Sequence, residues 1–344
     1  MPGVYHDPGR LRVRHRQIAS APVRLDYIVA GTAAAFPWVF CAAYFVWALD
    51  VPSWKEALLL GRFASPTSAG VLFSMLAAAG LSATWLFRKA RVLAIFDDLD
   101  TILFMIPLKM MMVGFRWQLA VAVFVIVVSL WLAWRHLHAL RLPVNWQWML
   151  VYAGVITCVC EAIYLWSTLI DDTVPVHLEV LLPAFVLGCM LERRPAHGRH
   201  GHDGHEAHES PAERRAATIV SACFMVLVGL SMPPVPRAEI DWGTVAAHVV
   251  VVTALSNLGK MFPALCYRRE ASFRERLAVA ISLFPRGEVG AGVLVVSLSY
   301  GLSGAALAVA VLSLALNLLL TGLFIAVVKH LISRSGAGPA PGAA

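Results

Sequence analysis

A long apolar run towards the carboxyl end of the chain is interrupted by the stretch Phe284-Pro285-Arg286-Gly287-Glu288-Val289-Gly290-Ala291-Gly292. Proline removes a backbone hydrogen-bond donor, and glycines allow dihedral angles that a helix does not use. A break is therefore expected within an apolar helix. In a bilayer, a broken helix persists only where its freed backbone groups meet polar partners or line a cavity. The alternative is a proline kink that packs against its neighbours and has no function.

An earlier apolar run carries a similar interruption, which reads Ala64-Ser65-Pro66-Thr67-Ser68-Ala69-Gly70. Here too a proline, a glycine and several hydroxyl side chains lie among apolar residues. A second broken helix is therefore expected. Taken alone, this signal is weaker than the one at 284–292.

The composition indicates a membrane protein. Of the 344 residues, 59% are hydrophobic and 14% are charged, whereas soluble domains carry about 25% charged residues. A transmembrane helix needs about 20 apolar residues, so roughly ten spans and their loops leave no room for a separate soluble domain. The apolar runs predict spans at 27–49, 57–86, 91–114, 117–139, 147–170, 174–191, 215–236, 242–267, 274–300 and 303–332.

The first three and the last three spans run in opposite directions, and the middle span of each group is the broken one. This is the pattern of an inverted repeat, in which an ion site is expected where the two breaks meet near the midplane. We therefore expect an all-α membrane protein with two broken, crossing helices. The predicted segments are a basic tail 1–26, a transmembrane domain 27–332 made of a first repeat 27–114, connecting and scaffold helices 115–241 and a second repeat 242–332, and a tail 333–344.

The net charge of +7 fits this topology. Most Lys and Arg residues fall in segments that ten spans place on the same side as both termini, and such an excess marks the cytoplasmic side. We expect both termini to be cytoplasmic, in a cell membrane and most simply the bacterial inner membrane, with no nucleic-acid partner. The few basic residues on the outer side are Lys55, Arg62, Arg116 and Arg237.

The loop 192–214 is rich in histidine. A solvated cytoplasmic linker is the simpler interpretation, and weak metal binding or pH sensing is the alternative, because imidazole binds metals and titrates near neutrality. No ligand geometry is evident in this loop. Its histidines, the only metal candidates, are His197, His200, His202, His205 and His208.

The third span carries the acidic residues Asp97, Asp98 and Asp100. An ionisable side chain in the hydrocarbon costs roughly 2.5–3.5 kcal/mol on insertion scales, so each needs a partner or a function. Successive helical residues point about 100° apart, so one acid of the Asp97-Asp98 pair can hold a structural partner while the other faces a cavity. Alternatively the span begins later and the acids lie in the inner headgroup region, which fits Asp100 better than the pair.

The eighth span contains Lys260 as a lone cation. A buried ammonium group stays charged only beside a carboxylate. A partner among the acids of the third span is therefore expected. The alternative is that Lys260 extends along the helix to the inner interface.

In order and approximate spacing, these residues resemble the monovalent cation:proton antiporter superfamily, in its bacterial sodium/proton branch with an Asp-Asp motif. The resemblance covers nearly the whole chain. It rests on Thr67-Ser68, Asp97-Asp98, Leu182-Pro183-Ala184-Phe185-Val186-Leu187-Gly188, Val226-Leu227-Val228-Gly229-Leu230, Lys260 and Pro285-Arg286-Gly287-Glu288.

The resemblance implies a role for each matching position. Asp98 would bind the cation and protons, and Asp97 would form a salt bridge with Lys260. Thr67, within the Thr67-Ser68 motif, would complete the oxygen shell of the ion together with backbone carbonyls. Arg286 and Glu288 would stabilise the second break. No cofactor is implied beyond the transported ions.

The chain also departs from the family pattern. Asp100 and Lys109 are extra charges in the third span, and Glu161 and Glu179 are further acids, either of which could pair with Arg286 or have a structural role. Family members of this kind have two or three helices before the one that matches 27–49. Those helices belong to the scaffold and dimer side of the fold, so we expect the first helices to be lacking here, and a homodimer stays open.

We therefore expect a secondary transporter that exchanges Na⁺ or Li⁺ for H⁺ by alternating access, and by resemblance an electrogenic one. One alternative is a potassium/proton antiporter or efflux system. Another is a shortened, non-transporting membrane protein whose histidine-rich loop senses metal or pH. An enzyme is not expected, because the spans contain no nucleophile–base pair, phosphate loop or metal-ligand motif.

Overall fold

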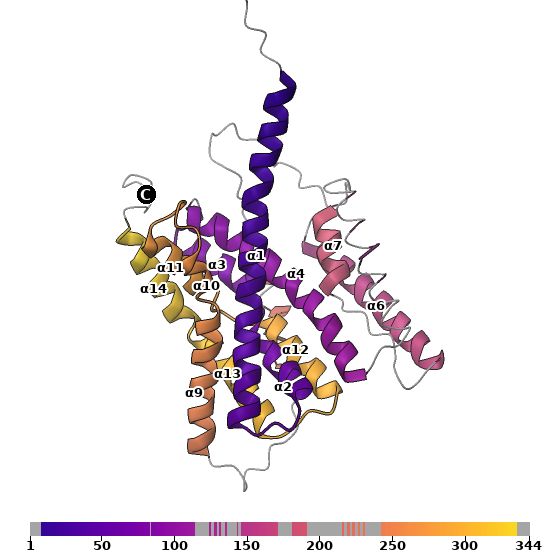
Figure 1. Ribbon diagram of the computed structural model, residues 1–344. Helices are drawn as coiled ribbons and strands as arrows, with labels where there is room; N and C mark the ends of the chain where they lie inside the picture. Colours follow the sequence, from indigo (N-terminus) through magenta and orange to yellow (C-terminus); the bar gives the residue numbers. More distant parts are fainter. Residues whose placement is uncertain are drawn as a thin grey trace, which may run out of the picture. The chain divides into compact units, whose positions relative to one another are not determined.

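The computed structural model describes residues 8–82, 84–113, 146–170, 181–190 and 242–335, with isolated positions between 124 and 143 and between 215 and 230. Every element among these residues is a helix (Figure 1). In chain order the elements are α1 (Pro8–Ala48), α2 (Trp54–Gly61), η1 (Arg62–Ala64), α3 (Ala69–Ala78), α4 (Trp85–Val113), α6 (Trp146–Ile170), α7 (Leu181–Met190), α9 (Trp242–Gly259), α10 (Phe262–Leu265), α11 (Phe273–Ser282), α12 (Glu288–Ser299), α13 (Ala305–Leu319) and α14 (Thr321–Ser333).

Several of these helices are suited to a bilayer. Within the described ranges, three segments are long and apolar enough to cross one: Arg24–Ala48, Gln147–Trp166 and Trp242–Leu265. Helices α13 and α14 meet at a bend of 45° and become a fourth span if they are counted together. The chain is therefore a multi-pass, all-α membrane protein.

The chain forms two compact units. The first unit combines Met1–Asp100 with Pro233–Ala344, and the second is Thr101–Met232. The first unit holds both interrupted stretches together with Asp97, Asp98 and Lys260. In the second unit, α6 packs against α7.

Both predicted interruptions are present in the first unit. The span predicted at 57–86 is divided into α2, η1 and α3, with non-helical backbone at 65–68. The span predicted at 274–300 is divided into α11 and α12, with non-helical backbone at 284–287. In α3, Ser68 is the N-cap, and its side chain accepts a hydrogen bond from the backbone N–H of Val71, which gives this half-helix a defined start.

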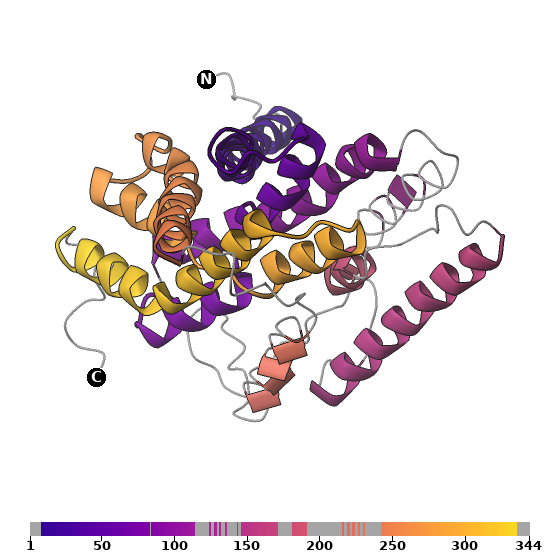
Figure 2. The same cartoon turned by 90° about the horizontal axis from the view of Figure 1, so that it is seen from below.

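Helix α1 organises this unit. It packs against α2 and α9, and Figure 2, which looks nearly along α1, shows these two helices on its two sides. Helices α1 and α2 approach closely at Gly61: a Cβ added to this glycine would lie only 2.9 Å from the backbone nitrogen of Ala42. At the other end of the unit, α11 packs on α14, and leucines of α3 and α4 such as Leu72, Leu76 and Leu93 are fully buried there.

Some boundaries differ from the apolar runs. Helix α1 begins at Pro8, so much of the predicted tail 1–26 is helical. Helix α4 begins at Trp85 and not near 91, so the acids of the third span lie near the middle of a 29-residue helix. The span predicted at 303–332 is bent at Leu320, and the one at 242–267 has a turn after Gly259. The predicted spans 117–139 and 215–236 lie largely outside the described residues.

Candidate functional site

The two interrupted stretches meet in the first unit. The backbone N–H of Ser68 donates to the carbonyl of Pro285 at 2.9 Å. The Thr67 hydroxyl donates to the carbonyl of Leu283 at 3.0 Å. A Cβ on Gly287 would lie only 2.9 Å from the Ser68 hydroxyl oxygen, so the two breaks cross closely at this glycine. Each break therefore supplies hydrogen-bond partners for the other, as buried backbone groups require.

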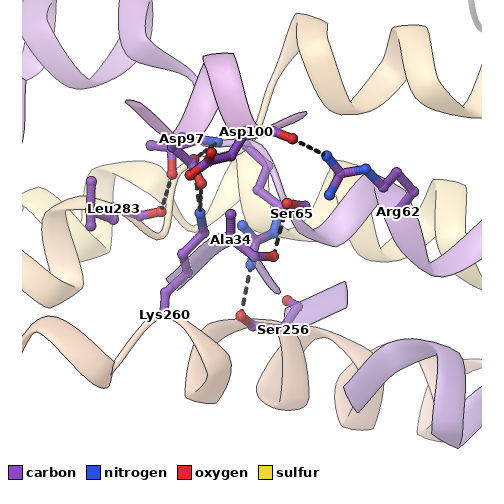
Figure 3. A network of polar contacts seen from close by, with 10 residues as sticks. Ala34, Arg62, Ser65, Asp97, Asp100, Ser256, Lys260 and Leu283 are labelled. Atoms are coloured by element: carbon purple, nitrogen blue, oxygen red, sulfur yellow. Dashed lines mark hydrogen bonds and ion pairs between the residues drawn. The ribbon is translucent and has the colours of Figure 1, made fainter. Parts of the chain in front are cut away.

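Asp97 lies at this crossing and is held on two sides (Figure 3). The ammonium nitrogen of Lys260 is 2.8 Å from both carboxylate oxygens. The backbone N–H of Thr67 donates to Oδ2 of the same carboxylate at 2.7 Å. Asp97 is 2% exposed and Lys260 is completely buried. The pair therefore joins α4, the first break and the end of α9.

Lys260 occupies a turn and not the interior of a helix. Helix α9 ends at Gly259, and the Lys260 backbone N–H bonds back to the carbonyl of Asn257 at 3.1 Å. This turn packs closely on α1, because a Cβ on Gly259 would lie 2.4 Å from the backbone nitrogen of Pro37. The contact fixes the position from which the Lys260 side chain reaches Asp97.

The close packing at Gly259 gives a first prediction. Gly259→Ala should lower the free energy of unfolding by at least the roughly 1–3 kcal/mol typical of overpacked cores, because the backbone of α1 cannot yield as a side chain can. The matched control is Gly292→Ala, since a Cβ on Gly292 meets nothing within 4 Å. Melting temperatures of both variants in detergent test this. Equal melting temperatures would show that α1 and the turn do not pack in this way.

Asp98 differs from its neighbour. Its side chain is partly exposed, whereas Asp97 is buried. Adjacent helical residues point about 100° apart, so the two carboxylates leave α4 in different directions. The arrangement therefore has one fully buried acid in an ion pair and one partly exposed acid, of which the oxygen Oδ1 is buried.

The second break is tied to α9 by Arg286. This side chain is completely buried, and its guanidinium Nη2 donates to the carbonyl of Ser256 at 2.8 Å. Glu288 is the first residue of α12, and its side chain lies outside what the structure describes. The stabilising role expected for Arg286 thus has a contact to support it, and that of Glu288 remains a prediction.

Two residues that the sequence analysis did not select also belong to this region. Asn317 of α13 is completely buried and donates to the Ser256 hydroxyl at 3.5 Å. Arg62, counted above as an outer residue, is also completely buried, and it donates to the backbone carbonyl of Asp100 at 3.2 Å. A polar residue inside an apolar run was the available signal for both, as it was for Lys260.

Other candidates lie elsewhere or outside the described residues. Glu161 is exposed on α6 of the second unit. The side chain of Lys109 and all of Glu179 lie outside the described part. The same holds for His197, His200, His202, His205 and His208, so the metal or pH-sensing interpretation of the loop 192–214 stays a prediction. Among the described residues, no group of three or more His, Cys, Asp or Glu side chains could hold a metal ion.

Two comparisons with known proteins bear on the identity of the chain. A search of curated proteins finds no match. The family model described as "Sodium/hydrogen exchanger, transmembrane" matches residues 23–331, which include both breaks, Asp97, Asp98, Lys260 and Arg286. With the match covering most of its length, the chain belongs to the sodium/hydrogen exchanger family, within the monovalent cation:proton antiporter superfamily.

Proposed function

We propose that this chain exchanges Na⁺ or Li⁺ for H⁺ by alternating access, and that the cation and protons take turns at the carboxyl group of Asp98. Membership of the family supports exchange of cations for protons across a membrane in general. The choice of ion and the site come from the arrangement of the acids on α4.

The contrast between Asp97 and Asp98 carries the proposal. Both oxygens of Asp97 are engaged by Lys260, and Oδ2 also accepts from Thr67. A carboxylate held in this way is a poor ligand for a passing ion, because binding would have to break a buried ion pair. Asp98 is the acid with partial exposure, so it is the better placed of the two to meet a hydrated ion.

The breaks supply the kind of ligands that such an ion needs. Na⁺ and Li⁺ are hard cations, which prefer oxygen ligands from carboxylates, hydroxyls and backbone carbonyls. The Thr67 hydroxyl donates its proton to Leu283, so its oxygen lone pairs are what it can offer to a cation. Ser68 lies beside it, and non-helical backbone at 65–68 presents further carbonyl groups.

Competition for one carboxylate explains exchange without a chemical fuel. A proton and a metal cation cannot occupy the same carboxylate oxygens, so loading one releases the other. If the loaded site opens to only one side at a time, the gradient of either ion drives the other. The proposal requires no resident cofactor. It includes a cell-membrane location with cytoplasmic termini, in the bacterial inner membrane, and it is compatible with a homodimer.

The ion choice is tested in liposomes that contain the purified protein and a pH-sensitive dye. With an acidic interior, addition of Na⁺ or Li⁺ outside should raise the internal pH rapidly, and K⁺ at the same concentration should have a much smaller effect. Protein-free liposomes control for leakage. A stronger response to K⁺ would favour the potassium/proton alternative, and no response to any of the three ions would contradict transport.

A further inference from the structure

A third acid on α4, Asp100, lies close to the proposed ion site, and the proposed function assigns it no role. It is one helical turn beyond Asp97 and is 2% exposed. Its Oδ2 atom has no hydrogen-bond partner. This oxygen faces the backbone of α1, because a Cβ on Gly31 would lie 3.1 Å from it. Helix α1 therefore covers this side of the Asp100 carboxyl group.

Arg62 approaches Asp100 from η1, directly before the first break (Figure 3). Its Nη2 donates to the Asp100 backbone carbonyl at 3.2 Å, and its guanidinium carbon lies 4.8 Å from the centre of the Trp38 ring on α1. Arg62 and Asp100 are both almost completely buried. A buried charge without a nearby opposite charge is strongly destabilising. The positive charge of Arg62 and the negative charge of Asp100 therefore stabilise each other.

Arg62 has a counterpart in the second break. Arg286 is also completely buried, and it too donates through Nη2 to a backbone carbonyl of another helix, at Ser256 of α9. One buried guanidinium bonded to the main chain thus lies in η1, directly before the first break, and another lies within the second break. Arg62 is bonded to the helix that carries Asp97, and Arg286 to the helix that precedes Lys260.

The charges at the crossing are therefore nearly balanced before any ion binds. The charged and titratable groups that act on Asp100 are Arg62 from η1, Lys260 from the turn after α9, Tyr27 from α1, and Asp97 on its own helix. Lys260 places its ammonium on both oxygens of Asp97. This leaves Arg62 as the nearby cation that offsets the charge of Asp100.

We propose that Arg62 and Asp100 form a second charge couple that sets the affinity of the transport site for its cation, without contacting the cation. The couple acts through its electric field: the guanidinium weakens cation binding at the neighbouring carboxylates, and the Asp100 carboxylate strengthens it. Both are positioning residues in this sense. The inference rests on the proposed function, because it needs a cation site on α4.

The test uses the apparent KM for Na⁺, measured in liposomes at alkaline pH. Arg62→Gln removes a positive charge, and Asp100→Asn removes a negative charge. At an effective dielectric constant near 20, a charge several ångströms away changes binding by about tenfold or more. Arg62→Gln should therefore lower KM by about tenfold and Asp100→Asn should raise it by about tenfold. In the double variant the two changes should largely cancel.

Two controls separate the field from a loss of structure. Arg62→Lys keeps the positive charge and loses the flat guanidinium contact with Trp38. If the charge alone sets the affinity, the KM of this variant should stay near that of the wild type. Asp26→Asn removes another buried acid, one that pairs with Lys89 at 3.0 Å, and it should leave KM unchanged. A merely structural role would lower the maximal rate in Arg62→Lys and Arg62→Gln alike.

The proposal is overturned if the two single variants shift KM in the same direction, or if neither shifts it. If Arg62→Gln does not fold, Asp100→Asn and the double variant decide in the same way: a raised KM that the second change restores supports the couple, and an unchanged KM contradicts it. Absence of exchange by the wild-type protein would instead contradict the proposed function, so the two failures are distinguishable.

Discussion

Asp98→Asn should abolish cation-driven proton flux while the protein stays folded. Asparagine keeps the size of the side chain but cannot take up a proton at neutral pH and carries no charge to attract a cation. Because Asp98 is partly exposed and is not the acid bonded to Lys260, the change should not uncover a buried charge. The measurement is dye-reported flux in liposomes after addition of Na⁺ or Li⁺, together with the melting temperature in detergent.

The matched control for this variant is again Asp26→Asn. Asp26 is an acid of the same unit that pairs with Lys89, so the same chemical change is made away from the crossing. Flux should persist in this control. Undiminished exchange by Asp98→Asn would remove Asp98 from the site, and a collapse of its melting temperature would show that Asp98 supports the fold.

Much of the fold could be predicted because charged residues and prolines are rare inside transmembrane helices and therefore stand out in an apolar sequence. Charged residues and prolines are costly inside an apolar helix, so Pro285, Pro66 and Lys260 are evident in the sequence. The structure places both breaks where the prolines and glycines indicate, and it brings Lys260 to Asp97. These features depend on local chemistry and on the need of a buried charge for a partner.

Arg62 shows where this kind of argument fails. It lies near the end of a predicted span, where a basic residue normally reaches the interface, and it was therefore counted as an outer residue. Its burial depends on α1 and α4, which supply Trp38 and the Asp100 carbonyl. Contacts between segments far apart in the chain leave no periodic signal in the sequence.

Helix ends were also hard to predict. Helix α4 begins at Trp85 and includes Arg88 and Lys89, which the hydropathy pattern assigns to a loop between the spans 57–86 and 91–114. Basic residues do not stop a helix, since Lys and Arg have good helix propensity. An apolar run therefore marks the part of a helix within the hydrocarbon, and the helix itself can extend further. The bend at Leu320 lies two residues before Gly322, and hydropathy alone gives no indication of it.

Lys260→Ala should be strongly destabilising. The ammonium of Lys260 contacts both oxygens of Asp97, and both side chains are almost completely buried. Breaking a buried ion pair by removing one partner typically costs about 3–5 kcal/mol, because the other charge stays in the low-dielectric interior. The variant should therefore show a clearly lower melting temperature in detergent, and its flux should fall with the loss of a positioned Asp97.

Two comparisons separate the cost of breaking the ion pair from the cost of truncating a long side chain. Lys89→Ala removes a lysine that is 11% exposed and pairs with Asp26, which is 10% exposed, and with Glu270, which is 37% exposed. Because these three side chains are all more exposed than Lys260 and Asp97, the cost should be smaller. Adding Asp97→Asn to Lys260→Ala removes the stranded charge and should recover part of the stability, as the double-mutant cycle requires for a direct interaction. If Lys260→Ala melts at the wild-type temperature, or if Asp97→Asn lowers the stability further, the buried pair does not hold α4 to the end of α9.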